Sequence, residues 1–377
     1  MPGSSDIDPA RLDAWVDSLG AIGQLRSIAD RAPAYLVGGV VRDLLMGREV
    51  TDLDVAIEGD VDALGDLAGF SLEREGLFLT GRLEQGEMKI DVARARAETY
   101  AAPGALPEVR PASIAEDLAR RDFTLNAMAF PLSGERELID PHGGLADLRA
   151  GRLRVLHERS FVDDPTRALR AARYAARFGF ELETETERLL RVTDLSTVSE
   201  DRTDGELRRI AAEDDPAAAL RLLVDWGVIP SLDPGAPDRV AEVTRLAAAP
   251  PWSDWVDRDL AVMLAIVRPL PQIRELSAAT PERPSEAAQL AEPWDPAQLL
   301  VARALGAEWL DRYATEWRHV ALEISGDDLL AEGIPEGPAV GRGLDAALSG
   351  KLDGELSGRE EELRIALAAA RGEIPED

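Results

Sequence analysis

Hydrophobic residues follow two different spacings in the N-terminal part of the chain, and the two spacings predict different elements. Apolar side chains at helical spacing predict helices over residues 6–30, 40–47 and 61–70. Alternating or short apolar runs between turn residues predict strands over residues 34–39, 52–59, 71–85 and 87–96. Because helices and strands are interleaved with short turns, we expect a small α+β unit here.

The pattern of hydrophobic positions changes further along the chain. Residues 100–111 contain three prolines and predict a loop. Ile114 begins a segment that reads as helix, turn and strand up to residue 132. After Leu145, helical spacing predominates, first in an arginine-rich stretch and beyond Asp214 in an acidic one. The sequence therefore predicts an α+β part followed by an all-α part.

Length and composition exclude several classes of protein. A chain of 377 residues with 45% hydrophobic residues is long enough for two to four domains. The absence of cysteine excludes disulfides and zinc–thiolate sites, and the three histidines lack metal-ligand spacing. The sequence contains neither an apolar run of ~18 residues nor a signal-peptide pattern at its start. We expect a soluble, cytoplasmic protein that does not enter a membrane.

The distribution of charge is less simple than the net charge of −29. That value argues against nucleic-acid binding, since phosphate contacts need a basic surface. However, all basic residues except Lys89 and Lys351 are arginines, whose planar guanidinium suits phosphates and bases. These arginines cluster between Arg149 and Arg209, which predicts a local anion-binding surface, although biased genome composition also explains the preference for arginine over lysine.

Two aspartates occupy one face of the predicted strand 52–59. Asp52 and Asp54 are two residues apart, so both carboxylates point to the same side. Such close anions repel unless a divalent cation holds them, and oxygen ligands without histidine or cysteine favour Mg²⁺, with Mn²⁺ as the alternative. Asp91, in the strand 87–96, is a candidate third catalytic carboxylate. The simpler interpretation is that these acids are exposed turn or strand residues.

A glycine pair between a strand and a helix offers a place for phosphate. At Gly38 and Gly39 the backbone can approach an anion closely, and Arg42 follows one turn into the helix. A tight turn beside a surface arginine would give the same pattern. In the stretch ARRDFTLNAMAF, Arg121 is a candidate phosphate ligand and Asp122 a candidate acceptor for a ribose hydroxyl.

The stretch SFVDDPTRALRAARYAARFGF predicts a helix with a basic face. Pro165 suits its first turn, with Asp163 or Asp164 as the cap. Arginines three residues apart then form a stripe on one side of the helix, and no glutamate is interleaved with them. We expect this stripe to bind an anionic ligand. Its arginines are Arg167, Arg170 and Arg173.

These motifs together resemble a known family. LVGGVVRD, DLD, RRDFTLNAMA, DPHGGLADL and DDPTRALRAARYAARFGF occur in the order found in class II tRNA nucleotidyltransferases and bacterial poly(A) polymerases. Those enzymes belong to the polymerase-β-like nucleotidyltransferase superfamily. The resemblance covers residues 30–210 strongly and 323–347 less specifically.

The resemblance implies a division of the chain and a substrate. A mixed-sheet nucleotidyltransferase head would span residues 1–148, followed by an all-α neck at 149–212 that recognises the base, a body at 213–322 and a tRNA-binding tail at 323–377. The implied partners are the acceptor arm and 3′ end of tRNA, with CTP and ATP as substrates and two divalent ions, Mg²⁺ or Mn²⁺, as cofactors.

The resemblance also implies residue roles. Gly39 and Arg42 match the triphosphate-binding turn, and Asp52 and Asp54 match the metal-binding pair. The E-D-x-x-R motif, which reads the edge of the incoming base, falls on residues 163–167 and has aspartate in place of its glutamate. The nucleotide-binding residues expected in all are Gly38, Gly39, Arg42, Arg121, Asp122, Asn126, Asp163, Asp164, Arg167, Arg170 and Arg173.

Three other interpretations stay open at this point. The chain would be a poly(A) polymerase if it used ATP alone, or a partial enzyme if it added only CC or only the terminal A. An inactive RNA-binding relative is a third possibility, and the intact Asp52, Asp54 and Arg42 argue against it. A dinucleotide-binding dehydrogenase is disfavoured, because GGVVRD lacks the third spaced glycine.

Overall fold

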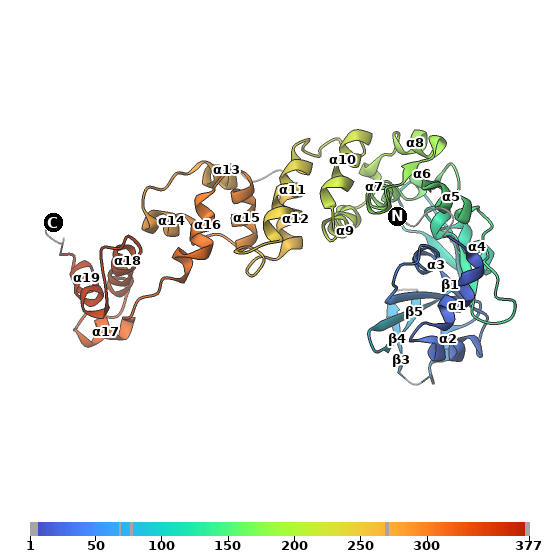
Figure 1. Ribbon diagram of the computed structural model, residues 1–377, viewed down its shortest axis with the longest axis horizontal. Helices are drawn as coiled ribbons and strands as arrows, with labels where there is room; N and C mark the ends of the chain where they lie inside the picture. Colours follow the sequence, from blue (N-terminus) through green and yellow to red (C-terminus); the bar gives the residue numbers. More distant parts are fainter. Residues whose placement is uncertain (1–6, 68, 76–77, 268–270, 374–377) are drawn as a thin grey trace. The chain divides into compact units, whose positions relative to one another are not determined.

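The computed structural model describes residues 7–67, 69–75, 78–267 and 271–373. It forms two compact units. Unit 1 consists of Met1–Asp214 and Ala218–Pro230, and unit 2 of Asp215–Ala217 and Ser231–Asp377. The mixed sheet in unit 1 and the helices of unit 2 confirm the α+β fold class (Figure 1). The finer division into head, neck, body and tail stays a prediction.

Unit 1 is built around a six-stranded sheet with the strand order β3-β4-β5-β2-β1-β8. The strands are β1 (Ala34–Val37), β2 (Asp52–Ile57), β3 (Phe70–Glu75), β4 (Phe78–Gln85), β5 (Met88–Arg94) and β8 (Ala129–Pro131). β2 and β5 pair in parallel and the other neighbours pair antiparallel. The amino ends of β2 and β5 therefore lie next to the carboxyl end of β1, at the same end of the strands.

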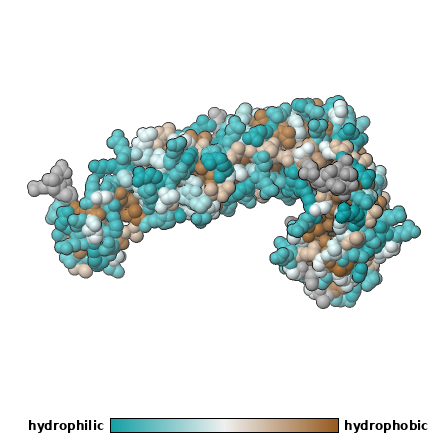
Figure 2. All heavy atoms as spheres, viewed as in Figure 1, coloured by the Kyte–Doolittle hydropathy of each residue, from teal (hydrophilic) through white to brown (hydrophobic). Residues whose placement is uncertain are grey.

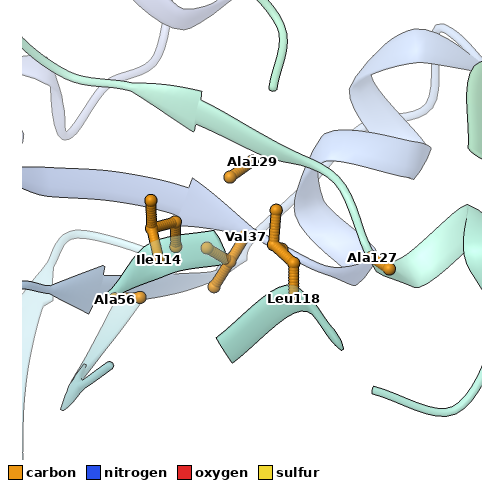
Figure 3. Packing of buried hydrophobic residues seen from close by; sticks show 6 residues of the cluster. All are labelled: Val37, Ala56, Ile114, Leu118, Ala127 and Ala129. Atoms are coloured by element: carbon orange, nitrogen blue, oxygen red, sulfur yellow. The ribbon is translucent and has the colours of Figure 1, made fainter. Parts of the chain in front are cut away.

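The alternation of residues along β2 assigns the two faces of the sheet. Leu53, Val55 and Ile57 are buried on one face, whereas Asp52 and Asp54 lie on the other. That second face is covered over β1 and β2 by helix α4 (Ile114–Ala119), which begins with a capping box. Figure 3 shows the buried side chains between them. They are Val37, Ala56, Ile114, Leu118, Ala127 and Ala129.

Three predicted elements of unit 1 differ from the structure. The helix expected at 6–30 is divided into α1 (Leu12–Asp17) and α2 (Ile22–Ala29), with Gly20 in the connection. The helix expected at 61–70 is only a 3₁₀ turn at Val61–Leu64, because glycines at 65 and 69 follow it at once. The loop expected at 100–111 ends in a strand, β7 (Glu108–Pro111), which pairs with β6 (Arg96–Thr99).

Helices follow the sheet within unit 1. Arg167–Phe178 forms α7, whose residues Tyr174 and Phe178 stack on one another with ring centroids 6.0 Å apart. Tyr174 also meets the buried Phe123 edge to face at 5.9 Å, so α7 is packed directly on the sheet-bearing part of the unit. The other helices in this region are α3 (Gly39–Leu45), α5 (Gly144–Ala150), α6 (Ser160–Asp163), α8 (Thr184–Leu190), α9 (Glu200–Ala211) and α10 (Pro216–Trp226).

Unit 2 is all-helical in its described residues, as expected. Its helices are α11 (Ala236–Ala247), α12 (Arg258–Ile266), α13 (Pro271–Ala278), α14 (Pro284–Ala291), α15 (Pro296–Ala304), α16 (Trp309–Thr315), α17 (Gly326–Ala331), α18 (Pro338–Leu352) and α19 (Arg359–Arg371). The last three share a core of their own, which includes Leu329, Ala347 and Ala366. Glu362, fully buried among them, accepts a 2.6 Å hydrogen bond from Lys351 Nζ.

The surface agrees with the composition. Hydrophilic residues cover most of the face shown in Figure 2, as a chain with 30% charged residues requires. Among the helices formed by the described residues, none combines the length and the apolar character needed to cross a membrane.

Candidate active site

Unit 1 contains a cavity of about 420 Å³ with a strongly basic lining. Nine arginines line it, against four acidic residues, although the whole chain has a net charge of −29. A local excess of arginine in an acidic protein marks a site for an anionic ligand. The arginines are Arg42, Arg96, Arg120, Arg121, Arg167, Arg170, Arg173, Arg177 and Arg202, and the acids are Asp54, Glu98, Asp122 and Asp164.

The glycine turn forms one side of this cavity. Gly38 follows β1 with φ +70°, and a Cβ atom at this position would lie 2.5 Å from Arg121 Nη1, so the turn requires glycine. Gly39 then begins α3, which places Arg42 one turn further along. Arg42 is 3% exposed, and its guanidinium carbon lies 4.7 Å from the centre of the Phe178 ring. It is therefore held rigidly at the cavity wall.

The three candidate carboxylates lie on neighbouring strands. Asp54 and Asp91 are direct partners in the parallel register of β2 and β5, and Asp52 precedes Asp54 on the same face. Asp54 lines the cavity. Partial loss of hydration raises the pKa of its carboxyl, and the charges of Asp91 and Asp52 raise it further, while Arg121 opposes this rise. Such mutual destabilisation of carboxylates is what a divalent cation would relieve.

The carboxylates differ in their present partners. Asp91 accepts a 2.8 Å bond from Arg82 Nε, whereas Asp52 is exposed at the start of β2. In the part of the chain that the structure describes, no three acidic or imidazole side chains converge as a preformed metal cage. Asp52 and Asp54 nevertheless fit a hard divalent ion, since they are oxygen donors on one face beside an arginine-lined cavity.

A buried chain of polar contacts connects the glycine turn with helix α7. Arg42 Nη1 donates to Asn126 Oδ1 at 2.6 Å, and Asn126 Nδ2 donates to Asp122 Oδ1 at 3.0 Å. Asp122 Oδ2 lies 2.7 Å from Arg170 Nη2. Burial opposes the charge of Asp122, but Arg170 and Asn126 outweigh it and keep the pKa of Asp122 below its ordinary value. Asp122 and Asn126 are thus held in fixed orientations at the cavity.

Asp117 fixes the two consecutive arginines next to this chain. Asp117 is 1% exposed, and its carboxylate lies 2.7 Å from Arg120 Nη2 and 2.9 Å from Arg121 Nη2. The backbone N–H of Arg96 donates to the same carboxylate at 3.2 Å. Arg121 is therefore oriented toward Gly38 by a buried counter-ion.

The arginine stripe of α7 is paired more fully than the sequence predicts. Its acidic partners come from other elements and not from α7 itself. The sequence could not indicate them, because the spacing of residues along a helix identifies only neighbours within that helix. Arg173 lies 3.5 Å from Glu213 and 3.8 Å from Glu206, distances that are long for ion pairs. Arg167 instead donates to Ser160 Oγ at 2.6 Å and lies on the cavity wall.

The two consecutive aspartates before α7 lie in different surroundings. Asp164 lines the cavity, and its Oδ1 atom accepts from Thr166 Oγ1 at 2.6 Å and from Arg202 Nη2 at 2.8 Å. Asp163 is outside the cavity lining and pairs with Arg159 at 3.0 Å. Asp164 also accepts from the Thr166 N–H, but α7 begins at Arg167 with Thr166 as its N-cap residue, so neither aspartate occupies the expected cap position.

The cavity also contains residues that the motifs did not single out. Tyr100 donates to Glu98 at 2.9 Å, and burial together with the Glu98 charge raises the pKa of Tyr100 to about 12. Arg202 comes from α9, 38 residues after Asp164. Only Arg177 had a visible signal, since it continues the arginine stripe by one turn of α7.

Known proteins are similar to this chain in both sequence and structure. The sequence profile of the poly A polymerase head domain matches residues 34–154. A CC-adding tRNA nucleotidyltransferase of Deinococcus radiodurans is 34% identical over 379 residues, which cover 96% of this chain and 94% of that protein. A solved complex of a CCA-adding enzyme with ATP superposes with a TM-score of 0.75 and 29% identity, over 97% of this chain and 96% of that one.

Another solved structure is the Thermotoga maritima CCA-adding enzyme complexed with tRNA, with a TM-score of 0.71 and 29% identity over 96% of both chains. By contrast, the chain spans only 20–49% of the length of three A-adding tRNA nucleotidyltransferases that it matches. The resemblance predicted from the motifs is confirmed by these matches. The chain belongs to the tRNA nucleotidyltransferase family.

Proposed function

We propose that this protein is a template-independent RNA nucleotidyltransferase that adds C, A or both to the 3′ end of tRNA, with CTP and ATP as substrates. The observation that supports it most is the cavity, where nine arginines gather in an acidic protein and Asp54 stands at their edge. A triphosphate is the substrate class that needs this much positive charge beside a carboxylate pair.

The glycine turn and its neighbours would hold the triphosphate. Gly38 and Gly39 let the backbone approach phosphate oxygens, and Arg42 and Arg121 present guanidinium groups fixed by Asn126 and Asp117. Because these groups are already oriented, little order has to be imposed when the nucleotide binds.

The other wall of the cavity would recognise the sugar and the base. Asp122 is held by Asn126 and Arg170 where it can accept from a ribose hydroxyl. Asp164 and Arg167 offer an acceptor and a donor, the pattern with which a protein complements the edge of C or A. Asp163 has no part in this proposal beyond its pairing with Arg159.

Asp52 and Asp54 would hold two divalent ions, which we propose to be Mg²⁺ with Mn²⁺ as the alternative, and Asp91 would be the third carboxylate of the site. When bound, such an ion supplies Lewis-acid activation and neutralises phosphate charge. In the reaction, the terminal 3′ hydroxyl of the RNA releases its proton and its oxygen forms a bond to the α-phosphorus, while the bond from this phosphorus to the departing pyrophosphate breaks. The arginines of the cavity stabilise the charge that moves onto the leaving group.

The proposal includes the acceptor arm and 3′ end of tRNA as the partner, with the region 323–377 as its binding tail, and a cytoplasmic location. Loop 100–107 would contribute to nucleotide choice, since Arg202 Nη1 donates to the Gly104 carbonyl at 2.8 Å while Arg202 also contacts Asp164.

A single-nucleotide extension assay tests the proposal. Purified protein with Mg²⁺ is offered tRNA ending at the discriminator base, at C and at CC, with CTP, ATP or both. Complete CCA on the shortest acceptor identifies a CCA-adding enzyme. Stopping at CC, or accepting only the CC end with ATP, identifies a partial enzyme, and long A tails on unrelated RNA identify a poly(A) polymerase.

The variant Asp52→Ala supplies the matching test of the metal site. We expect it to lose nucleotide incorporation and to retain tRNA binding, because Asp52 is exposed at the edge of the sheet and supports no core contact. The control Asp62→Ala removes another exposed aspartate, which lies outside the lining of the cavity. Unchanged incorporation by Asp52→Ala would refute the metal assignment, and tRNA binding without any incorporation by the native protein would identify an inactive relative.

A further inference from the structure

A second cavity of about 430 Å³ lies beside the first in unit 1. The two cavities share four lining residues, which are Asp54, Arg96, Arg120 and Arg121. Asp54 therefore stands at the junction of two spaces, and a group bound in either space reaches the same carboxylate. The nucleotide proposed above accounts for the first cavity only.

The floor of this second cavity is an uncovered part of the sheet. Helix α4 packs against Val37 and Ala56 and so covers β1 and part of β2 (Figure 3). On the same face, the register pairs Asp54 with Asp91 of β5, and Asp91 in turn with Arg82 of β4. The core cluster over Val37 contains no described residue of β4 or β5, and the next paired positions along these strands, Ala93 and Thr80, have small side chains.

The chemistry of this floor differs from that of a plain sheet surface. Arg82 lies 2.8 Å from Asp91, and both side chains are about half exposed, at 45% and 48%. An ion pair so open to water is weak and can exchange its partners. The rest of the lining contributes four further arginines and two further acids, so the cavity is also basic.

Nucleotidyl transfer brings two anionic substrates together, the nucleoside triphosphate and the 3′ end of the RNA. The RNA end must approach the α-phosphorus from the side opposite the leaving pyrophosphate. We propose that the second cavity is the acceptor subsite, which binds the 3′-terminal nucleotide of the RNA through its phosphodiester. Arg82 is a phosphate ligand there, and Thr80 and Ala93 leave room for the sugar. This inference rests on the proposed function and assigns a separate place to its second substrate.

The arrangement of charges favours an RNA strand over a second nucleoside triphosphate. The second cavity has five arginines and three acids, whereas the first has nine and four. A phosphodiester has one negative charge per residue, and a triphosphate has several, so the less basic cavity suits the strand. Arg82 and Asp91 on its floor are about half exposed, which leaves a path for a chain that continues into solvent.

Steady-state kinetics on the full-length protein tests the assignment. The variants are Arg82→Ala, Arg82→Lys and Ala93→Leu, and the control is Arg188→Ala, an exposed arginine paired with Glu185 outside both cavities. The acceptor is a tRNA transcript that ends at the discriminator base, and the nucleotide is CTP or ATP, whichever the native protein adds. Each substrate is varied while the other is saturating.

For Arg82→Ala we expect kcat/KM for the acceptor to fall about tenfold, as for the loss of one charge-assisted bond to phosphate. KM for the nucleotide should stay within about twofold, and the salt dependence of acceptor use should weaken by about one phosphate contact. Ala93→Leu should reproduce the acceptor defect by filling the floor without changing charge, and Arg82→Lys should restore part of it. The control should match the native protein.

The two proposals fail in different ways. If the native protein incorporates no nucleotide, the proposed function is refuted before the variants are compared. If the native protein is active and the acceptor parameters of Arg82→Ala and Ala93→Leu are unchanged, the subsite is refuted. A rise in nucleotide KM equal to the acceptor defect also refutes it, since the second cavity would then belong to the triphosphate. Ala93→Leu keeps the test valid if Arg82→Ala fails to fold.

Discussion

Asp117 is the residue whose replacement tests the organisation of the site most directly. It is buried, and its carboxylate accepts hydrogen bonds from the side chains of Arg120 and Arg121 and from the backbone N–H of Arg96. The variant Asp117→Asn keeps the shape of the side chain and removes its charge. Two arginines then lose a buried counter-ion, and Arg121 loses the contact that orients it toward Gly38.

The size of the effect follows from burial. Removing one partner of a buried ion pair costs about 3–5 kcal/mol, because the other charge stays desolvated. Arg120 and Arg121 are 21% and 18% exposed, so water compensates part of this loss. We expect Asp117→Asn to lower the free energy of unfolding of unit 1 by about 3 kcal/mol and to raise KM for the nucleotide.

The stability difference between the native protein and Asp117→Asn should depend on pH. Burial opposes the charge of Asp117, but Arg121 and Arg120 outweigh it and lower its pKa below 3.8 in the folded protein. A group with a lowered pKa stabilises the fold above its unfolded pKa, and this contribution disappears as the pH falls toward the folded pKa. The difference between native protein and variant should therefore be constant from pH 7 to about pH 5 and shrink below about pH 4.

Urea denaturation followed by circular dichroism, at several pH values, measures this difference. Asp62→Asn is the matched control, since Asp62 is exposed and should change stability by less than about 0.5 kcal/mol. A loss below about 1 kcal/mol at pH 7 would show that Asp117 is not an essential counter-ion. An equally large difference at pH 7 and pH 3 would refute the electrostatic explanation.

Two further predictions concern the walls of the first cavity. Gly38→Ala should destabilise the protein by about 1–2 kcal/mol and weaken nucleotide binding, because φ at this position is +70° and the new Cβ would meet the Arg121 side chain. Thermal denaturation measures the first effect and KM for the nucleotide measures the second. Arg202→Ala should change the ratio of kcat/KM for CTP and ATP without loss of folding, because Arg202 contacts Asp164; an unchanged ratio, equal to that of the control Arg188→Ala, would contradict this role.

The sequence determines those features that depend on neighbouring residues. The alternation of Asp52, Leu53 and Asp54 predicts a strand with two acids on one face, and the structure has that strand as β2. The glycine pair before Arg42 likewise predicts a turn between strand and helix, and Gly38 has the positive φ that explains it. Both are local consequences of backbone geometry, so a short stretch of chain contains the whole signal.

Only the tertiary structure decides which charges meet. Arg170 pairs with Asp122 of the sheet-bearing part and Arg177 with Glu213 beyond α9, and no spacing along α7 indicates either partner. The cavity likewise gathers Tyr100 and Arg202 from distant segments. The energy of an ion pair depends on distance and burial, which the folded chain sets. For this reason the sequence indicates that arginines gather, and the fold decides which of them face a ligand.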